Sequence, residues 1–337
     1  QLIALLGQAR QQKVKLDVRR QNTPRLLEFI LSPETMNAPS VDRAFRLDSG
    51  AAYIRISAFE KNTGADLRAA IEKLGGRSLP GLVIDLRNNG GGVLAAALEA
   101  ASLFLRPGQT IISVRGRSKK TEQIDVPAQA AEPYAFPVAI LVNEKSASAS
   151  EVLAAALQDH GRARIVGEPT FGKGLVQSVY PLRGGSGLAL TVAFYYSPKG
   201  RSLQRPLRYN QLAGATTGTE SGGLTPDVLA RPEASSRLRL VLETSASFTA
   251  FATEFVRRNS LAAGFRITGA VLDEYRSWLA ARDIQPAVRE WTADLAWIRN
   301  RLEQEIVTLG IGVEAGDEIE LRHDPVVRRA LEQLAAR

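Results

Sequence analysis

Two short apolar runs, each followed by a turn of small residues and then by helical spacing, limit this chain to a narrow set of folds. The first run spans residues 81–87 (Gly81-Leu-Val-Ile-Asp-Leu-Arg87) and the second spans residues 138–142 (Val138-Ala-Ile-Leu-Val142). Nearly continuous apolar runs of this length are typical of parallel strands that are buried on both faces. Because helical patterns follow at residues 94–105 and 148–160, the sequence predicts an α/β fold with a largely parallel sheet.

The predicted core continues on both sides of these runs. A helix is expected to begin at Thr63 and to end at Gly75-Gly76. Residues 34–48 contain Asn37, Pro39 and mixed charge, so we expect a linker there. Alternation or short apolar runs predict further strands at residues 13–19, 26–31, 51–57, 109–114, 163–167, 175–182 and 187–197.

The strand patterns stop after Thr225-Pro-Asp227. Helices are expected at roughly residues 234–258, 268–282, 286–308 and 324–336. Their apolar stripes include Tyr275, Trp278 and Trp291, and such stripes are typical of core packing rather than of a cofactor site. The sequence therefore predicts a helical appendage after the α/β core.

Composition excludes several classes of function. The 337 residues include no cysteine and two histidines, so a zinc site is not expected. The net charge of +8 is spread over the chain and is densest at Arg115-Gly-Arg-Ser-Lys-Lys120. A solvated loop explains that cluster, and nucleic-acid binding is not expected. No apolar run approaches the ~18 residues of a transmembrane helix.

Ser148 and Lys173 are the candidate pair for nucleophilic catalysis. Ser148 lies in Lys145-Ser-Ala-Ser-Ala-Ser-Glu151, between an apolar run and a helix, and Lys173 lies in the turn-rich segment Gly167-Glu-Pro-Thr-Phe-Gly-Lys-Gly174. A serine hydroxyl needs a base to become a nucleophile, and a desolvated lysine can be that base. The apolar neighbours from which we expect this desolvation are Phe171, Leu175 and Val176.

The two histidines are poor candidates for this base. His160 follows Ser148 by 12 residues on one expected helix, a separation of roughly 18 Å. A histidine just before Gly161 is expected to interact with the helix C-terminus. His323 lies in Leu321-Arg-His-Asp-Pro325, with no serine near it in sequence. A Ser-His-Asp triad is therefore not expected.

Three segments offer chemistry, and each also has a plain structural interpretation. Asp85-Leu-Arg-Asn-Asn-Gly-Gly-Gly92 can present backbone N–H groups to an anion or can form only a tight turn. Ser146-Ala-Ser-Ala-Ser150 can admit a substrate backbone or can supply a helix N-cap. Phe171-Gly-Lys-Gly-Leu-Val-Gln177 can align Lys173 with Gln177 on one strand face or can be a solvated turn. The residues alone leave these alternatives open.

The lysine segment also differs from a phosphate-binding P-loop at two points. A P-loop needs Ser or Thr after its lysine and a helix to receive the phosphates. Here Gly174 follows Lys173, and Leu175-Val-Gln-Ser-Val-Tyr180 alternates as a strand does. Nucleotide binding is therefore not expected.

Taken together, the motifs resemble those of the carboxyl-terminal processing peptidases, the tail-specific serine proteases of family S41 that use a Ser-Lys dyad. The likeness runs from about Pro39 to Val228. Besides the segments quoted above, it includes Tyr195-Tyr-Ser-Pro-Lys-Gly-Arg-Ser202 and Gly223-Leu-Thr-Pro-Asp227. The resemblance implies an α/β fold with a crotonase/ClpP-like spiral core.

The resemblance also implies a role for each site residue. Ser148 is the nucleophile, Lys173 the general base and Gln177 the residue that orients the lysine. The backbone N–H groups of Gly92 and Ala149 form the oxyanion hole. The implied reaction is endoproteolysis at or near protein C-termini through an acyl-enzyme, without a metal or an organic cofactor.

The N-terminus departs from the family pattern. Residues 1–33 resemble only the last helix and strand of a PDZ domain, and most of that domain, including its peptide-binding groove, is not in this chain. We therefore expect a PDZ remnant at residues 1–33, a peptidase core at residues 34–230 and a helical extension at residues 231–337.

The resemblance leads to expectations about partners and location. Proteins or peptides with accessible C-terminal tails are the expected substrates, nucleic acid is not a partner, and an adaptor protein and a homo-oligomer remain open. Export to the periplasm or cell envelope is expected, with the signal segment outside this chain. Zero cysteines fit export, although a cytosolic protein can also lack them.

Two other classes of function remain open. A catalytically silent relative would bind ligands or act as a scaffold, and a serine-reactive label on Ser148 would separate it from a peptidase. A crotonase-like acyl-CoA enzyme would use glycine-rich N–H groups for an enolate but would not need a Ser-Lys pair, so CoA binding would identify it.

Overall fold

The computed structural model describes residues 12–20, 23–34, 39–117, 121–206, 222–262 and 264–336. The chain divides into two units, Gln1–Pro39 and Ser40–Arg337. In the first unit, β1 (Val14–Val18) pairs antiparallel with β2 (Leu27–Leu31). Both strands predicted there are confirmed, whereas the assignment of residues 1–33 to a PDZ domain stays a prediction.

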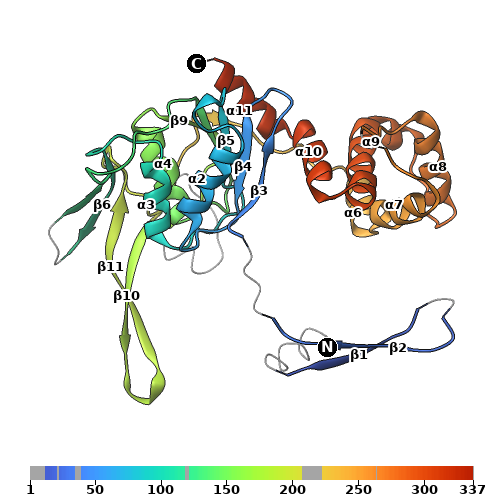
Figure 1. The fold of residues 1–337 in the computed structure, drawn as a ribbon, viewed down its shortest axis with the longest axis horizontal. Helices are drawn as coiled ribbons and strands as arrows, with labels where there is room; N and C mark the ends of the chain where they lie inside the picture. The colour runs from blue at the N-terminus through green and yellow to red at the C-terminus, as the bar shows by residue number, and fades with distance from the viewer. Residues whose placement is uncertain are drawn as a thin grey trace. The chain divides into compact units, whose positions relative to one another are not determined.

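The second unit is built on a six-stranded sheet in the order β12-β9-β8-β5-β4-β3 (Figure 1). All neighbours in this sheet are parallel except β3 and β4, so the predicted α/β class and largely parallel sheet are confirmed. The strands are β3 (Val41–Arg46), β4 (Ala52–Ile56), β5 (Leu82–Asp85), β8 (Val138–Val142), β9 (Ala163–Gly167) and β12 (Val228–Leu229).

The expected linker at residues 34–48 is wrong in its second half. Val41–Arg46 forms the edge strand β3, antiparallel to β4. Asp42 and Arg43 interrupt the apolar pattern there, but both form ion pairs, with Arg55 and with Asp317 respectively. An edge strand with one partly exposed face can carry such charged residues.

Three helices cover one face of this sheet: α2 (Thr63–Lys73), α3 (Leu94–Ser102) and α4 (Ala149–Asp159) (Figure 1). Alternate residues of each strand face these helices, as the period of two requires. In β5, for example, Leu82 and Ile84 are fully buried in the core beneath the helices. A short 3₁₀ turn, η1 (Gly76–Ser78), follows α2.

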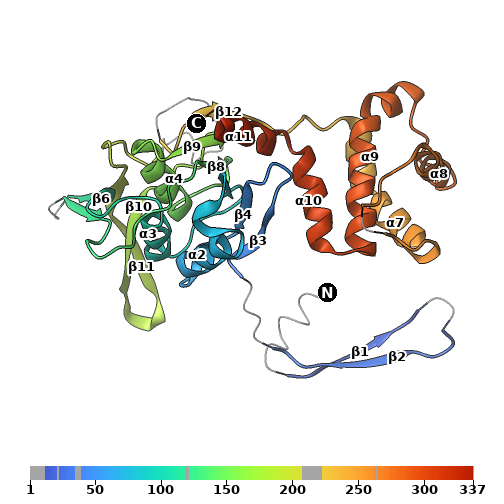
Figure 2. The ribbon, with the colours of Figure 1, turned by 45° about the horizontal axis from the view of Figure 1, so that its top comes forward.

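Helix α11 (Pro325–Ala335) covers the opposite face of the central strands (Figure 2). Its residues Val326, Val327, Ala330 and Leu334 share one buried cluster with Val83, Ala139, Leu141 and Val166 of the sheet. Burial on both faces explains why residues 81–87 and 138–142 read as continuous apolar runs. The last helix of the chain is therefore part of the α/β core.

A second, antiparallel sheet has the order β10-β11-β6-β7. Its strands are β6 (Thr110–Gly116), β7 (Glu122–Asp125), β10 (Leu175–Pro181) and β11 (Gly187–Tyr196). Strands β10 and β11 form a long hairpin, closed by the 3₁₀ turn η2 (Arg183–Gly185), that extends away from the parallel sheet (Figure 1). The sequence predicted three of these strands and missed β7.

The helical region comprises α6 (Arg237–Thr244), α7 (Ser247–Arg258), α8 (Gly269–Ala280), α9 (Val288–Gly310) and α10 (Val313–His323). The single helix predicted over residues 234–258 is broken at Ala246, whose φ of 52° is left-handed. Tyr275 and Trp291 belong to the buried cluster of this region, with ring centroids 6.3 Å apart, so their expected role in packing is confirmed. No helix in the described ranges is long and apolar enough to cross a membrane.

The contribution of α11 to the core can be measured with a matched pair of substitutions. We expect Val327→Ala to lower the free energy of unfolding by about 2 kcal/mol, because it removes two methyl groups from a site with 1% exposure. Val313→Ala, at a position 65% exposed, is the control and should cost less than ~0.5 kcal/mol. Urea denaturation followed by circular dichroism measures both, and equal losses would contradict this role of α11.

Candidate active site

Strands β5 and β8 are parallel neighbours, so the segments that follow them emerge at the same edge of the sheet. Residues 86–92 follow β5, and residues 143–148 follow β8. Several hydrogen bonds hold the segments together; among them, Ser146 Oγ donates to the Leu86 carbonyl at 2.7 Å, and the Ala147 N–H donates to the Asn89 carbonyl at 3.0 Å. The two motifs predicted around Gly92 and Ser148 therefore form one site.

Asn89 is the internal brace of the glycine-rich turn. Its side chain is fully buried; Nδ2 donates to the Ile56 carbonyl and Oδ1 accepts the Gly91 N–H, both at 2.8 Å. Its carbonyl also accepts the Ser150 hydroxyl at 3.0 Å. One asparagine thus links the end of β4, the turn and the start of α4.

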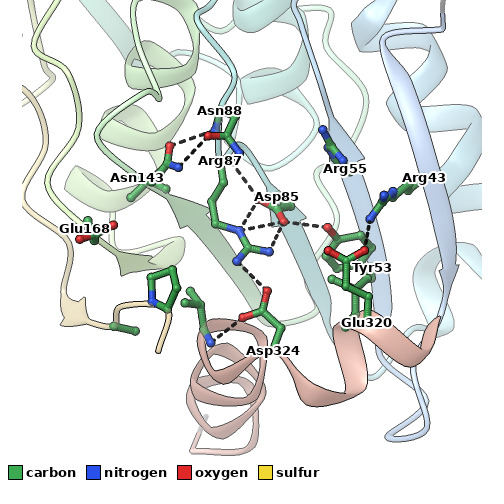
Figure 3. Close-up of a pocket in the computed structure, with 15 residues that line it drawn as sticks. Arg43, Tyr53, Arg55, Asp85, Arg87, Asn88, Asn143, Glu168, Glu320 and Asp324 are labelled. Atoms are coloured by element: carbon green, nitrogen blue, oxygen red, sulfur yellow. Dashed lines mark hydrogen bonds and ion pairs between the residues drawn. The ribbon is translucent and has the colours of Figure 1, made fainter. Parts of the chain in front are cut away.

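A pair of asparagines joins the two segments from outside. The Asn88 N–H donates to Asn143 Oδ1 at 2.9 Å, and Asn143 Nδ2 donates to Asn88 Oδ1 at 3.0 Å (Figure 3). Asn88 has a φ of 61°, in the left-handed region that asparagine tolerates better than most residues. The reciprocal hydrogen bonds offset the cost of this conformation.

Ser148 occupies a strained position at the start of α4. Its φ of 58° and ψ of −115° lie outside the regions that most non-glycine residues adopt, and it is half-buried. Such outliers persist only where the surrounding structure imposes them, and they are concentrated at functional sites. The conformation is that of a sharp strand-to-helix turn, which projects a serine hydroxyl from the backbone.

The backbone N–H groups of Gly92 and Ala149 belong to the two segments that meet at Ser148. Within the described ranges, neither the Gly92 N–H nor the Ala149 N–H donates a hydrogen bond to another group. Gly91 permits the close approach, because a Cβ there would lie 2.8 Å from Ser148 Cβ and 3.0 Å from the Ala149 nitrogen. Gly92 has a φ of 142° and packs on Phe59, whose carbonyl would be 2.1 Å from an added Cβ. A side chain at either glycine would disrupt this arrangement.

A buried carboxylate, Glu151, connects the serine turn to the lysine segment. Its side chain has no exposure and accepts four hydrogen bonds. Oε2 accepts the N–H groups of Ser148 and Lys173 at 2.8 and 2.9 Å, and Oε1 accepts the Thr170 hydroxyl and the Gly172 N–H at 2.5 and 2.8 Å. Four donors and the N-terminus of α4 together compensate for burying the charge.

The backbone of Lys173 therefore lies close to that of Ser148, because both N–H groups donate to Glu151 Oε2. The Lys173 residue is nevertheless exposed. The expected apolar enclosure is wrong for the free protein, because Phe171 is 57% exposed while Leu175 and Val176 are half-buried. No hydrogen bond joins the Ser148 and Lys173 side chains, both of which belong to the described ranges. Lys173 also precedes β10, which begins at Leu175, so strand alternation does not align it with the exposed Gln177.

The histidines lie elsewhere, as predicted. His160 is the C-cap of α4, but its ring contacts the Thr110 carbonyl through Nε2 at 2.7 Å and Gln109 through Nδ1 at 3.2 Å rather than the carbonyl groups that end the helix, with which it was expected to interact. His323 is the last residue of α10, and burial lowers its pKa. The described residues contain no cluster of His, Asp or Glu that could hold a metal ion.

Three residues of the site, Glu151, Asn89 and Thr170, were not predicted from the sequence. Glu151 carried a usable signal, since a glutamate three residues after a helix-start serine is a capping-box pattern. Asn89 and Thr170 carried none, because their hydrogen-bond partners lie far away in sequence.

A serine in a strained strand-to-helix turn, packed against a glycine-rich turn, is typical of serine hydrolases. The model of peptidase family S41 matches residues 50–228, which is more than half of the chain. The chain belongs to peptidase family S41.

Curated relatives carry matching names. A carboxyl-terminal-processing protease of Synechocystis is 38% identical over 198 residues, covering 57% of this chain and 45% of that protein. A carboxy-terminal-processing protease of Bartonella bacilliformis is 41% identical over 165 residues, covering 48% and 38%. The chloroplastic carboxyl-terminal-processing peptidase 2 of Arabidopsis thaliana is 39% identical over 175 residues, covering 52% and 31%. The matches thus span less than half the length of these relatives.

Among solved structures, a photosystem II D1 C-terminal processing protease is 29% identical, with a TM-score of 0.45. The alignment covers 66% of this chain and 56% of that one.

The connecting role of Glu151 generates a prediction. We expect Glu151→Gln to lower the free energy of unfolding by about 2 kcal/mol. The glutamine NH₂ would face buried N–H groups whose hydrogen bonds the wild-type carboxylate accepts, and these donors would lose their acceptor. Thermal and urea denaturation measure the loss. The control is Glu144→Gln, at an exposed position in the loop before Ser148, which should leave stability unchanged. Equal stability of both variants would contradict the role assigned to Glu151.

Proposed function

We propose that this chain is the catalytic part of a serine endopeptidase that cleaves proteins at or near their C-termini. The observation that carries the proposal is the strained backbone of Ser148, which precedes Ala149 and packs against Gly91 of the glycine-rich turn. Membership of family S41 and the names of the relatives support the same activity.

In the proposed mechanism, Ser148 Oγ attacks the carbonyl carbon of the scissile peptide bond. The neutral amine of Lys173 takes the hydroxyl proton and later transfers it to the leaving amine. The N–H groups of Gly92 and Ala149 stabilise the oxyanion of the tetrahedral intermediate, each by about 3 kcal/mol in the transition state. Water then hydrolyses the acyl-enzyme and restores Ser148.

The exposure of Lys173 adds a requirement to this mechanism. A lysine acts as a base only when it is neutral, and removal from water favours the neutral amine. Because Lys173 is exposed in the free protein, a bound substrate chain has to cover it and bring it to Ser148. Gln177 then orients the amine.

The proposal also covers the type of core fold, the origin of residues 1–33, the substrates and the cellular location. The parallel sheet with α2, α3 and α4 on one face supports a crotonase/ClpP-like spiral core over residues 34–230. Residues 1–33 are proposed to be the end of a PDZ domain. Substrates with accessible C-terminal tails and an exported location, in the periplasm or cell envelope, complete the proposal, and the lack of cysteine fits that location.

One observation favours a second candidate, a catalytically silent relative that binds ligands. The Ser148 and Lys173 side chains are not hydrogen-bonded in this structure. A silent protein would retain the turn and the N–H groups without activating the serine, so its Ser148 would not react with a fluorophosphonate.

The identity of the nucleophile can be tested by labelling. We expect a fluorophosphonate to modify Ser148, and Ser148→Ala to abolish both labelling and peptide cleavage while the circular dichroism spectrum stays unchanged. The helix start loses only about 1 kcal/mol when a serine there becomes alanine. Ser235→Ala, at an exposed position, is the control. Labelling that persists in Ser148→Ala would identify a different serine as the nucleophile.

The role of Lys173 can be tested by changing the acidity of its side chain. We expect Lys173→Arg to be as inactive as Lys173→Ala, because a guanidinium keeps its proton at every accessible pH. Gln177→Ala should retain more activity than either, since it removes only an orienting group. Lys145→Arg, at an exposed position in the serine loop, should cleave at the wild-type rate. Retained cleavage by Lys173→Arg would mean that Lys173 acts only through its charge.

A further inference from the structure

Arg87 connects the turn that carries Gly92 to the C-terminal helix α11. Its Nη1 donates to Asp324 Oδ2 at 2.7 Å, while Nε and Nη2 hold the Asp85 carboxylate at 2.6–3.0 Å (Figure 3). The Tyr53 hydroxyl donates to Asp85 Oδ2 at 2.7 Å. The side chains are 18% exposed for Arg87, 4% for Asp85 and 16% for Asp324, so this is a largely buried network.

One guanidinium in this network pairs with two carboxylates. Burial lowers the pKa of Arg87, but the carboxylates of Asp85 and Asp324 outweigh that effect and raise it, so the guanidinium stays charged. Burial also raises the pKa of Tyr53, which keeps its hydroxyl protonated and able to donate. Loss of Asp324 would leave Arg87 paired with Asp85 but would remove the acceptor of its Nη1 group, and a largely buried donor without its acceptor is costly.

Asp324 uses its two carboxylate oxygens for different partners. Oδ1 accepts the N–H groups of Val326 and Val327 at 2.7 and 3.2 Å, which caps the first turn of α11. Oδ2 accepts Arg87 Nη1. One side chain therefore fixes the start of α11 and the position of the guanidinium at the same time.

The position of Arg87 bears directly on the reactive groups. Asn88 and Asn89 follow it in the chain, and they make the hydrogen bonds that brace the turn before Gly92. Arg87 is therefore anchored to the start of α11, on the sheet face opposite α2, α3 and α4, shortly before the backbone reaches Gly92. A shift of Arg87 would move Asn88 and Asn89, whose hydrogen bonds hold the backbone as far as Gly91.

We propose that Asp324 is a positioning residue for the chemistry at Ser148, acting through Arg87 on the Gly92 turn. Asp324 lies outside residues 50–228, the part matched by the family model, so the C-terminal segment completes the site rather than merely following it. This inference rests on the proposed function and adds to it a residue that touches neither the substrate nor the reacting atoms.

The test is Asp324→Asn in the full chain. Asparagine is as good an N-cap as aspartate, so α11 keeps its cap, but the neutral side chain leaves Arg87 without its second carboxylate. We expect kcat per fluorophosphonate-titrated site to fall roughly tenfold to hundredfold, with KM unchanged, because small displacements of reacting groups have effects of that order. Titration of active sites removes any contribution from unfolded protein. Asp324→Ser, which also retains an N-cap, makes the same comparison if the asparagine variant does not fold.

The control is Asp48→Asn. Asp48 forms an exposed ion pair with Arg322 of α10, at 2.7 Å, and makes no contact with Arg87. It should cleave at the wild-type rate. An unchanged kcat in Asp324→Asn, or an equal loss in Asp48→Asn, would overturn the inference.

Hydrogen–deuterium exchange provides a readout that does not depend on peptidase activity. We expect the peptide covering residues 86–94 to exchange faster in Asp324→Asn than in the wild type, and no change in Asp48→Asn. Unchanged exchange would overturn the inference even if the wild-type chain cleaved no peptide. Failure of the proposed function would appear separately, as absence of cleavage and labelling in the wild type.

Discussion

The buried carboxylate of Glu151 holds the candidate site together. It accepts the backbone N–H groups of Ser148 and Lys173 through the same oxygen, so two segments separated by 25 residues in sequence become neighbours in space. Burying a charge is costly unless donors surround it, and here four donors and a helix N-terminus compensate. The strained backbone of Ser148 is one consequence, since the turn must return its N–H to the carboxylate at the start of α4.

The sheet sets where this interaction can occur. Parallel neighbours β5 and β8 bring their following segments to one edge, and helices on both faces keep the strands away from water. The face opposite α2, α3 and α4 is covered by α11, which comes from the end of the chain. The peptidase core is thus completed by residues far beyond the segment that the family model matches.

Much of this architecture could be predicted from the sequence because it depends on local patterns. The runs at residues 81–87 and 138–142 are apolar enough to identify buried strands, and small residues around Ser148 indicate a strand-to-helix turn. Strand β3 was missed because Asp42 and Arg43 mask its pattern, and their compensating partners Arg55 and Asp317 are visible only in the folded chain.

The environment of Lys173 could not be predicted from its neighbours in sequence. Phe171 and Leu175 are apolar, but adjacency does not determine which way side chains point, and Phe171 faces solvent. The assignment of α11 to the core had the same limitation, since an amphipathic helix does not specify the surface it packs on. Both outcomes depend on tertiary contacts, which the spacing of residue types does not encode.

We propose above all that a neutral lysine, not a histidine, activates Ser148. The most direct measurement is kcat/KM for peptide cleavage from about pH 5 to about pH 10. We expect activity to rise towards alkaline pH and to reach a plateau there, because only the unprotonated amine can accept the serine proton. A rise centred near the ~6.5 of an ordinary histidine, which disappears in His160→Ala, would contradict it.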